Sequence, residues 1–270
     1  MKPRQDGLSF NEQTMQNLQS SPIVDVQRAA DRATFDHGWL RTSHSFSFAD
    51  YVDPLNVNWG ALRVLNDDRV APGAGFPTHP HRDMEIITYV LSGELEHRDS
   101  IGNHGVVGPG GVQYMSAGSG VRHSEYNHSK TEGLHFLQMW VLPERLGGSP
   151  DYGQVDFDVE ERRNKWLLVA SGHGDQDAPV ALTQDAMLLV SRLEGVELRH
   201  TFEPQRLGFL FVADGGIDVS AFDEHDKPIQ SAKLSPGDAI RIAGVTRLKL
   251  SGAGEVVLWD VPPLRDAANG

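Results

Sequence analysis

The stretch from Phe76 to Asn127, which begins FPTHPHRDMEIITYVLSGELEHRDS and ends GPGGVQYMSAGSGVRHSEYN, decides the fold of this chain. It contains two short motifs, His79-x-His81 and His123-x-Glu125, separated by apolar runs and glycine-rich turns. Because alternate side chains of a β-strand share one face, each motif presents two metal-binding groups to the same side. Four such groups from two strands can converge inside a small barrel, so the stretch predicts a metal site.

Short apolar runs bounded by turn residues continue on both sides of this stretch. Such runs, rich in β-branched and aromatic residues, are typical of β-strands. Many of them at near-regular spacing predict an all-β protein built as a barrel or sandwich. The expected strands include residues 60–68, 85–91, 112–115, 134–142, 166–170, 187–193, 196–202 and 207–212.

The pattern of turns repeats once along the chain. The glycine turn at residues 91–97 is echoed at 213–219, and the Pro-Gly turn at 107–113 is echoed at 234–240. A strand, a glycine turn, a strand and a Pro-Gly turn in the same order form a weak internal repeat, which predicts two related barrels.

A segment rich in Gly, Pro and Asp at residues 143–161 is the best candidate for the boundary between the two barrels. The first 22 residues are polar and offer little apolar surface to bury, which is typical of a flexible tail. We therefore expect a tail at residues 1–22, an N-terminal metal-binding barrel at 23–145 and a C-terminal barrel at 146–270.

The second copy of the repeat lacks the metal-binding pattern. Aligning the two glycine turns places Thr201 and Glu203 where His79 and His81 stand. No His-x-Glu motif follows Pro236. The C-terminal barrel is therefore expected to be a degenerate copy that serves as scaffold.

The composition argues against several classes of protein. The chain has 270 residues, of which 39% are hydrophobic and 23% are charged, an ordinary soluble composition. No apolar run is long enough to span a membrane, and the N-terminus lacks the apolar core of a secretory signal, so we expect a cytoplasmic protein. With no Cys in the chain, the metal ligands must be His and carboxylate. The net charge of −13 argues against direct binding to nucleic acid.

The four residues His79, His81, His123 and Glu125 suit one first-row divalent metal ion. Three neutral imidazoles and one carboxylate bind such an ion and leave coordination positions open. A single carboxylate leaves the centre positively charged, which favours an anionic ligand such as a deprotonated enol or phenol. Glu125 could complete the metal sphere or act as a base toward an acidic hydroxyl, and the sequence leaves both roles open.

The other histidines carry weaker signals, because a single histidine is more often a surface or hydrogen-bonded residue than a ligand. His97 and His104 lie near the site in the sequence and could orient the metal ligands through hydrogen bonds. The others are His37, His44, His128, His135, His173, His200 and His225.

Several apolar residues could form a mouth above the metal and contact the substrate. These candidates for substrate binding are Phe76, Met84 and Met115, together with Trp140. Packing into an ordinary core explains the same residues more simply.

The segments THPHRDMEIITYVLSGELEHRDS and GPGGVQYMSAGSGVRHSEYN together resemble the signature of the pirin family, within the cupin superfamily. The flanking pieces HGWLRTSHSFSFADYVDP and ALRVLNDDRVAPGAGFPTHPH are similar to the N-terminal part of the family, particularly of its bacterial members with quercetinase activity. The resemblance runs from Val24 to Pro263 and is strongest up to Leu142. It implies a bicupin, with two tandem cupin barrels packed face to face and metal in the N-terminal barrel alone.

The resemblance also implies a cofactor and an activity. The ligands of the family's metal map onto His79, His81, His123 and Glu125. Family members are linked to iron, so we expect Fe(II), with Zn, Mn, Ni or Cu as alternatives. Some members cleave the flavonol quercetin with O2 and release CO. We therefore expect a quercetin 2,3-dioxygenase whose partners are a small aromatic enol and O2.

A second function stays open beside this one. The eukaryotic founder of the family is described as an iron- and redox-sensitive partner of transcription regulators, so the same site could act as a sensor in a protein that binds a protein partner. The acidic charge favours a protein partner over DNA itself. Two barrels in one chain would supply internally the interface that single cupins form by dimerising, so we expect a monomer.

Overall fold

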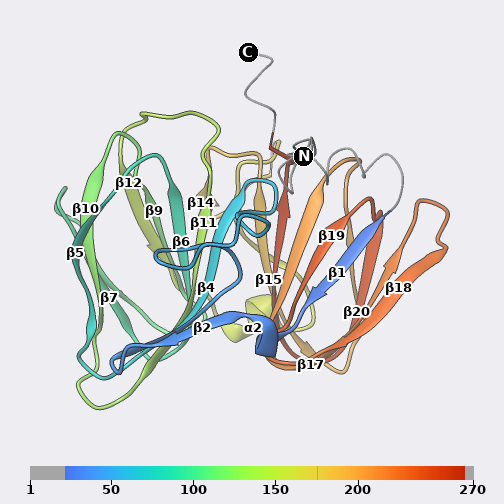
Figure 1. The fold of residues 1–270 in the computed structure, drawn as a ribbon, viewed down its shortest axis with the longest axis horizontal. Coiled ribbons are helices and arrows are strands. Elements are labelled where there is room, and N and C mark those ends of the chain that lie inside the picture. Colours follow the sequence, from blue (N-terminus) through green and yellow to red (C-terminus); the bar gives the residue numbers. More distant parts are fainter. Residues whose placement is uncertain (1–21, 175, 265–270) are drawn as a thin grey trace, which may run out of the picture.

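The computed structural model describes residues 22–174 and 176–264, which form two β-barrels lying side by side (Figure 1). Three sheets of seven, four and nine strands build these barrels. The predicted all-β fold with two tandem barrels is confirmed. The predicted tail, residues 1–22, lies outside the described part of the chain apart from its last residue.

The N-terminal barrel consists of a seven-stranded and a four-stranded sheet. The larger has the order β12-β9-β6-β11-β4-β3-β2 and the smaller the order β5-β10-β7-β8. The alternation of inward and outward residues along antiparallel strands gives each sheet one face toward the barrel interior. The strands are β2 (Ala33–Asp36), β3 (Leu40–His44), β4 (Leu62–Val70), β5 (Gly75–His81), β6 (Glu85–Ser92), β7 (Leu95–Asp99), β8 (His104–Val107), β9 (Val112–Ser116), β10 (Val121–Asn127), β11 (Leu134–Val141) and β12 (Asp151–Val155).

The C-terminal barrel is a single nine-stranded sheet that curls around its own interior. Two long strands make this possible, because β17 pairs with β19 in its first part, with β18 in its second part and with β20 along most of its length. The pairing of β17 with β20 shifts register between Val212 and Asp214. Just beyond this shift, Gly215 has a φ of 74°, and a Cβ there would lie 2.1 Å from the carbonyl oxygen of Ala253, so only glycine fits. The strands are β1 (Ile23–Gln27), β13 (Leu167–Ser171), β14 (Val180–Ala181), β15 (Met187–Glu194), β16 (Leu198–Thr201), β17 (Leu207–Phe222), β18 (Pro228–Leu234), β19 (Ala239–Ala243) and β20 (Arg247–Val261).

Two strands cross the boundary that we expect between residues 145 and 146. Strand β1 comes first in the described chain, yet it pairs with β19 of the C-terminal barrel. Strand β12 follows the expected boundary, yet it pairs with β9 of the N-terminal barrel. Each covers an edge that would otherwise expose unpaired backbone groups, so the barrels exchange one strand each.

Helical structure in the described residues is limited to short connections. A 3-10 turn, η1 (Ala29–Asp31), follows β1, and the four-residue helix α2 (Val159–Arg162) lies between the barrels. Asp158 and Glu161 form a capping box at the start of α2. No helix in this part of the chain is long and apolar enough to cross a membrane.

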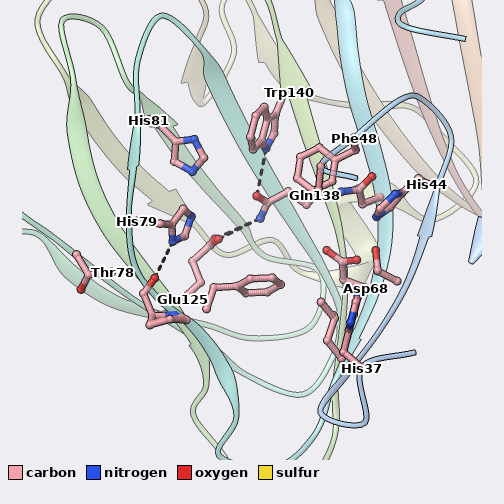
Figure 2. Close-up of a pocket in the computed structure, with 16 residues that line it drawn as sticks. His37, His44, Phe48, Asp68, Thr78, His79, His81, Glu125, Gln138 and Trp140 are labelled. Carbon is pink, nitrogen blue, oxygen red and sulfur yellow. Dashed lines mark hydrogen bonds between the residues drawn. The ribbon is translucent and has the colours of Figure 1, made fainter. Parts of the chain in front are cut away.

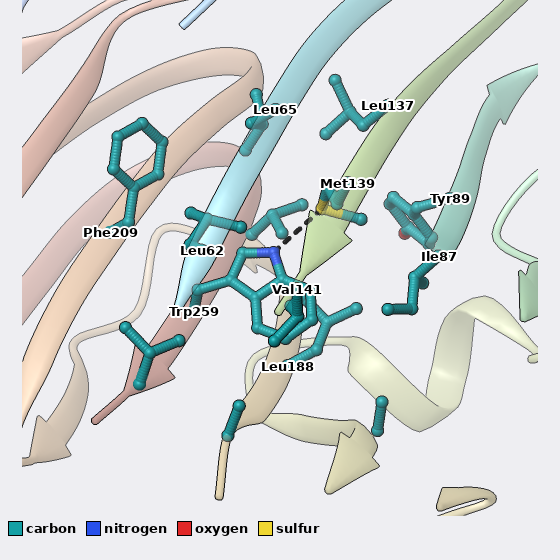
Figure 3. Close-up of a cluster of buried hydrophobic side chains, with 14 of the residues drawn as sticks. Leu62, Leu65, Ile87, Tyr89, Leu137, Met139, Val141, Leu188, Phe209 and Trp259 are labelled. Carbon is teal, nitrogen blue, oxygen red and sulfur yellow. Dashed lines mark hydrogen bonds between the residues drawn. The ribbon is translucent and has the colours of Figure 1, made fainter. Parts of the chain in front are cut away.

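The largest hydrophobic core lies between the barrels, where the seven-stranded and nine-stranded sheets face each other (Figure 3). Leu62, Leu65 and Met139 contribute from the N-terminal barrel, and Phe209 and Trp259 from the C-terminal barrel, all fully buried. The indole N–H of Trp259 donates a hydrogen bond to the sulfur of Met139 at 3.1 Å. Because burying each such side chain contributes roughly 1.5–3 kcal/mol, this core holds the two barrels together firmly.

Candidate metal centre

Strands β5 and β10 carry the two predicted ligand motifs and pair directly. In their antiparallel register His79 lies opposite His123, and His81 lies opposite Val121. The register shifts between His123 and Glu125, which marks an irregularity at the second motif. The structure therefore brings the two motifs, 44 residues apart at His79 and His123, onto one inward face of the four-stranded sheet.

The three imidazoles of His79, His81 and His123 converge. Their ring centroids lie 4.5–4.8 Å apart, and one nitrogen from each ring lies within 4.8 Å of the others. The Nε2 atoms of His79 and His123 are 3.0 Å apart. Two nitrogens bound to one ion at about 2.1 Å and at right angles are separated by about 3 Å, so this spacing suits two ligands of a common metal.

The protonation of the imidazoles also fits metal binding. The Nδ1 atom of His79 lies 2.8 Å from the carbonyl oxygen of Pro77, which holds the proton on Nδ1 and leaves Nε2 free. The Nε2 atom of His81 is buried and has no hydrogen-bond partner among the described residues, as expected of a ligand atom. Burial, with the neighbouring imidazoles, lowers the pKa of His81 and of His123 to about 3. Both rings are therefore neutral at physiological pH, the form that binds metal.

Glu125 is held in place by donors from the opposite, seven-stranded sheet. Its carboxylate accepts hydrogen bonds from Gln113 Nε2 at 3.0 Å, from Gln138 Nε2 at 3.1 Å and from Thr88 Oγ1 at 3.3 Å. Burial raises the pKa of Glu125, and hydrogen bonds and nearby imidazoles oppose that rise in part. The carboxylate is thus fixed in orientation and sits in surroundings that favour taking up a proton.

Sequence reasoning missed Gln113, Gln138 and Thr88. Each is a buried polar residue inside an otherwise apolar strand, on β9, β11 and β6 respectively. A polar residue at an inward position must find a hydrogen-bond partner in the interior. That pattern, in VQYMS, LHFLQMWV and EIITYVLS, was the signal available in the sequence.

His97 contacts the proposed ligand His123, as expected of a residue that supports the site, whereas His104 contacts Glu96 instead. His97 is fully buried, its Nδ1 lies 3.4 Å from Nδ1 of His123, and its ring stacks on Tyr152 at a centroid distance of 4.4 Å. Together with His123 and Glu125 it forms a second group of potential ligands. His104 is exposed, and its Nε2 lies 3.2 Å from a carboxylate oxygen of Glu96, away from the site.

A cavity of about 390 Å³ opens beside these residues (Figure 2). Its volume falls within the range of about 300–1,000 Å³ usual for small-molecule sites. His79, His81 and Glu125 form part of its wall, and Trp140 and Phe48 form an apolar part, with their rings in edge contact at 5.3 Å. A ligand in this cavity would lie directly against the three predicted metal ligands that line it.

The three candidates for substrate binding have different surroundings. Phe76 lines the cavity, as does Trp140. Met115 is buried in a hydrophobic cluster with Ile86, against which Met84 packs, and neither methionine lines the cavity. Met115 shares a face of β9 with Gln113 but lies two residues along the strand, where apolar neighbours enclose it.

The C-terminal barrel has a different interior. Both groups of potential metal ligands in the described residues belong to the N-terminal barrel. Thr201 and Glu203, which align with His79 and His81, are exposed, and the Glu203 carboxylate lies 3.2 Å from Nε2 of His173.

Comparison with known families divides the chain in two. The family described as Pirin matches residues 24–141, and the family described as Quercetinase C-terminal cupin domain matches residues 168–260. Quercetin 2,3-dioxygenase of Escherichia coli K12 is 39% identical over 243 residues, which cover 90% of this chain and all of the relative. A pirin-like protein of Caulobacter vibrioides is 46% identical over 186 residues, or 68% of this chain and 80% of the relative.

Solved structures agree with these matches. The crystal structure of the bacterial pirin YhhW from Escherichia coli in complex with nickel(II) is 38% identical and superposes with a TM-score of 0.80, covering 90% of this chain and all of the other. A quercetin 2,3-dioxygenase from Acinetobacter baumannii, at 18% identity and a TM-score of 0.65, shares the fold over 89% of this chain and 79% of the other.

Proposed function

Because the chain belongs to the pirin family and is built from two cupin domains, we propose that it is a metal-dependent dioxygenase that opens the ring of a flavonol with O2 and releases CO. One observation carries this proposal: three imidazoles converge, and two of them, with a buried carboxylate, line a partly apolar cavity large enough for a small aromatic molecule. The name of the relative from Escherichia coli, quercetin 2,3-dioxygenase, supports the same substrate class.

His79, His81, His123 and Glu125 are the proposed ligands of one divalent metal ion. Their three nitrogens and one carboxylate suit first-row metals, and the nickel(II) complex of the related bacterial pirin supports a metal at this site. We propose Fe(II) as the native ion, with Zn, Mn, Ni and Cu as alternatives. When bound, such an ion supplies Lewis acidity toward an enol oxygen and, for a redox-active metal, an electron partner for O2.

Glu125 has a proposed second role as the proton acceptor for the enol hydroxyl of the substrate. A base works best when its pKa approaches the working pH, and burial shifts the Glu125 carboxyl in that direction. The hydrogen bonds to this carboxylate keep its orientation constant while it gains or loses a proton. The donors are Gln113, Gln138 and Thr88. In the simpler alternative Glu125 serves as a metal ligand only.

The cavity wall gives the reaction a sheltered environment. Trp140 packs edge-on against both Phe48 and His81, at centroid distances of 5.3 and 4.8 Å, so an aromatic surface adjoins a metal ligand. A planar aromatic substrate would pack against this surface and displace water from it. Exclusion of water strengthens the electrostatic interactions of the bound enolate with the site.

The test is CO release from quercetin in air by protein reconstituted with Fe(II), measured beside metal-free protein and a Glu125→Gln variant. Metal-dependent CO is expected, with a lower rate for Glu125→Gln if the carboxylate accepts the proton. A matched control is Glu203→Gln, which changes a carboxylate in the C-terminal barrel and should leave the rate unchanged. CO from metal-free protein would contradict the proposal, and no CO from fully loaded protein would favour the regulatory alternative.

A further inference from the structure

The cavity has a second polar wall, which lies on the sheet opposite the proposed metal ligands. Strands β3 and β4 place Thr42 directly beside Asp68, and His44 directly beside Asn66, and all four line the cavity. They belong to the seven-stranded sheet, whereas the histidine ligands belong to the four-stranded sheet. Figure 2 shows Asp68 and His44 across the cavity from the ligand histidines, so a ligand held at the metal would extend toward them.

Three buried polar atoms in this wall lack a hydrogen-bond partner in the part of the chain that the structure describes. Asp68 is 4% exposed and Asn66 is 2% exposed, and one side-chain oxygen of each is buried without a hydrogen-bond partner among the described residues. The Nδ1 atom of His44 is likewise buried without a hydrogen-bond partner among these residues. Buried polar groups are nearly always hydrogen-bonded, so a cluster of three unpartnered groups in the wall of a cavity points to a ligand that supplies the missing partners.

The carboxyl of Asp68 is the strongest of these groups. Burial, with the negative charges of Asp67 and Glu125, raises its pKa to about 7, although the hydroxyl of Thr42 opposes that rise through a hydrogen bond. The charge of Arg32 also opposes that rise, yet one oxygen of the carboxyl stays without a hydrogen-bond partner among the described residues, so a ligand hydroxyl can still bind it. Hydrogen bonds from a hydroxyl to a carboxylate are short and about twice as strong as those between neutral groups.

We propose that Asp68, assisted by Asn66, binds a phenolic hydroxyl on the part of the substrate remote from the metal. This inference rests on the proposed function and narrows its substrate class to flavonols that carry hydroxyl groups besides the one that binds the metal. The metal-binding hydroxyl alone fixes one end of the molecule. The hydroxyl bound by Asp68 fixes the other end and selects against analogues that lack it, because such analogues leave one buried oxygen of the carboxyl without a partner.

Binding measured without O2 tests this assignment. The probes are quercetin and 3-hydroxyflavone, which keeps the metal-binding hydroxyl and lacks the others. We expect Fe(II)-loaded wild-type protein to bind quercetin roughly 10- to 100-fold more tightly than 3-hydroxyflavone, the range of one hydrogen bond to a charged group. Asp68→Asn should reduce this preference and Asp68→Leu should abolish it, while the affinity for 3-hydroxyflavone stays within about twofold.

Asp67→Asn is the matched control, because it removes the same charge from the adjacent residue. Asp67 faces away from the cavity, toward His135 and Arg69, and its variant should keep the wild-type preference. An unchanged preference in both Asp68 variants, or an equal loss of affinity for both flavonols, would overturn the assignment of Asp68 alone. Failure of both flavonols to bind wild-type protein would overturn the proposed function together with it.

Discussion

Inside the N-terminal barrel, His123, Glu125 and Gln113 are buried between two sheets, and a cavity opens beside them. The C-terminal barrel has instead an interior filled by apolar side chains, among them Leu248 and Ile240. Burying polar groups costs free energy unless each is hydrogen-bonded or binds a metal, whereas burying leucine and isoleucine is favourable. The same architecture therefore encloses candidate metal ligands in one copy and an apolar core in the other.

The shared core between the barrels connects these two roles. Met139 and Trp259 meet there, and Met139 lies on β11 next to Gln138, which binds Glu125 from the other face of the same strand. A strand that is firmly packed on one face holds a side chain on its other face in a defined position. The apolar barrel thus helps to fix the seven-stranded sheet from which the donors to Glu125 project.

The largest expected effect comes from removing a proposed metal ligand in the N-terminal barrel. His123→Ala deletes the imidazole whose Nε2 lies 3.0 Å from that of His79 and which also contacts His97. We expect metal content and CO release to fall together to the level of metal-free protein, as measured by metal analysis and gas detection on the same sample.

The corresponding change in the C-terminal barrel sharpens the contrast. Thr201 aligns with His79 and is exposed, so Thr201→Ala should leave both the metal content and the rate unchanged. Loss of metal in Thr201→Ala would contradict the division of roles between the barrels.

The next effect in size is a loss of stability without loss of metal binding. Leu248 is fully buried in the core of the C-terminal barrel. Leu248→Ala should lower the free energy of unfolding by about 2–5 kcal/mol, because it removes apolar contacts and leaves a cavity. Denaturant unfolding of metal-free protein measures this loss, and the metal affinity of the folded variant should equal that of wild type. A weakened metal site would show that the C-terminal core shapes the centre directly.

The sequence allowed the fold to be predicted, and the convergence of His79, His81 and His123, because both follow from local patterns. Period-two motifs such as His79-x-His81 specify one face of a strand, and the run of short apolar segments predicts barrels. The comparisons confirm the resemblance to the pirin family that the motifs indicated. These features need no knowledge of which strands pair.

Features that depend on strand pairing could not be predicted in the same way. The polar wall of Asp68 and His44 exists because β3, β4 and β11 lie opposite β5 and β10, which no local pattern specifies. The exchange of β1 and β12 between the barrels is likewise a property of sheet edges. Met115 is an example. The sequence proposed it as a substrate-binding residue, but whether a cavity or the hydrophobic core lies next to it depends on the strands packed around it.

A smaller effect is expected from the residues that orient Glu125. Gln113 Nε2 donates a hydrogen bond of 3.0 Å to the carboxylate, and Gln113→Leu removes this donor while keeping a similar volume. We expect metal affinity or turnover to fall about 10- to 100-fold, the usual cost of losing a group that orients a ligand. Gln230→Leu, at an exposed position of β18, is the control and should change neither. Equal behaviour of the two variants would mean that Glu125 needs no orientation from this glutamine.

The smallest expected effect concerns how the stability of the protein changes with pH, because histidines of the two barrels have pKa values shifted in opposite directions. In metal-free protein, burial lowers the pKa of His81 and His123 from 6.5 to about 3. Between those values the unfolded chain binds more protons than the folded one, so these histidines contribute stability above pH 6.5 that is lost as the pH falls toward 3. In the C-terminal barrel, burial lowers the pKa of His173, but hydrogen bonds with Asp185 and Glu203 outweigh it and raise the pKa overall. His173 therefore contributes stability that is present below pH 6.5 and lost as the pH rises.

The two contributions can be separated by the melting temperature of metal-free protein at pH 7.5 and pH 5.5, values chosen on either side of the usual histidine pKa of about 6.5. Acid should lower the melting temperature less in His123→Gln than in wild type, because that variant has lost a histidine that resists protonation when folded. The opposite shift is expected for His173→Gln, which loses a pair that acid strengthens. If both variants respond to pH as wild type does, these histidines do not account for the acid sensitivity, which then lies elsewhere in the chain.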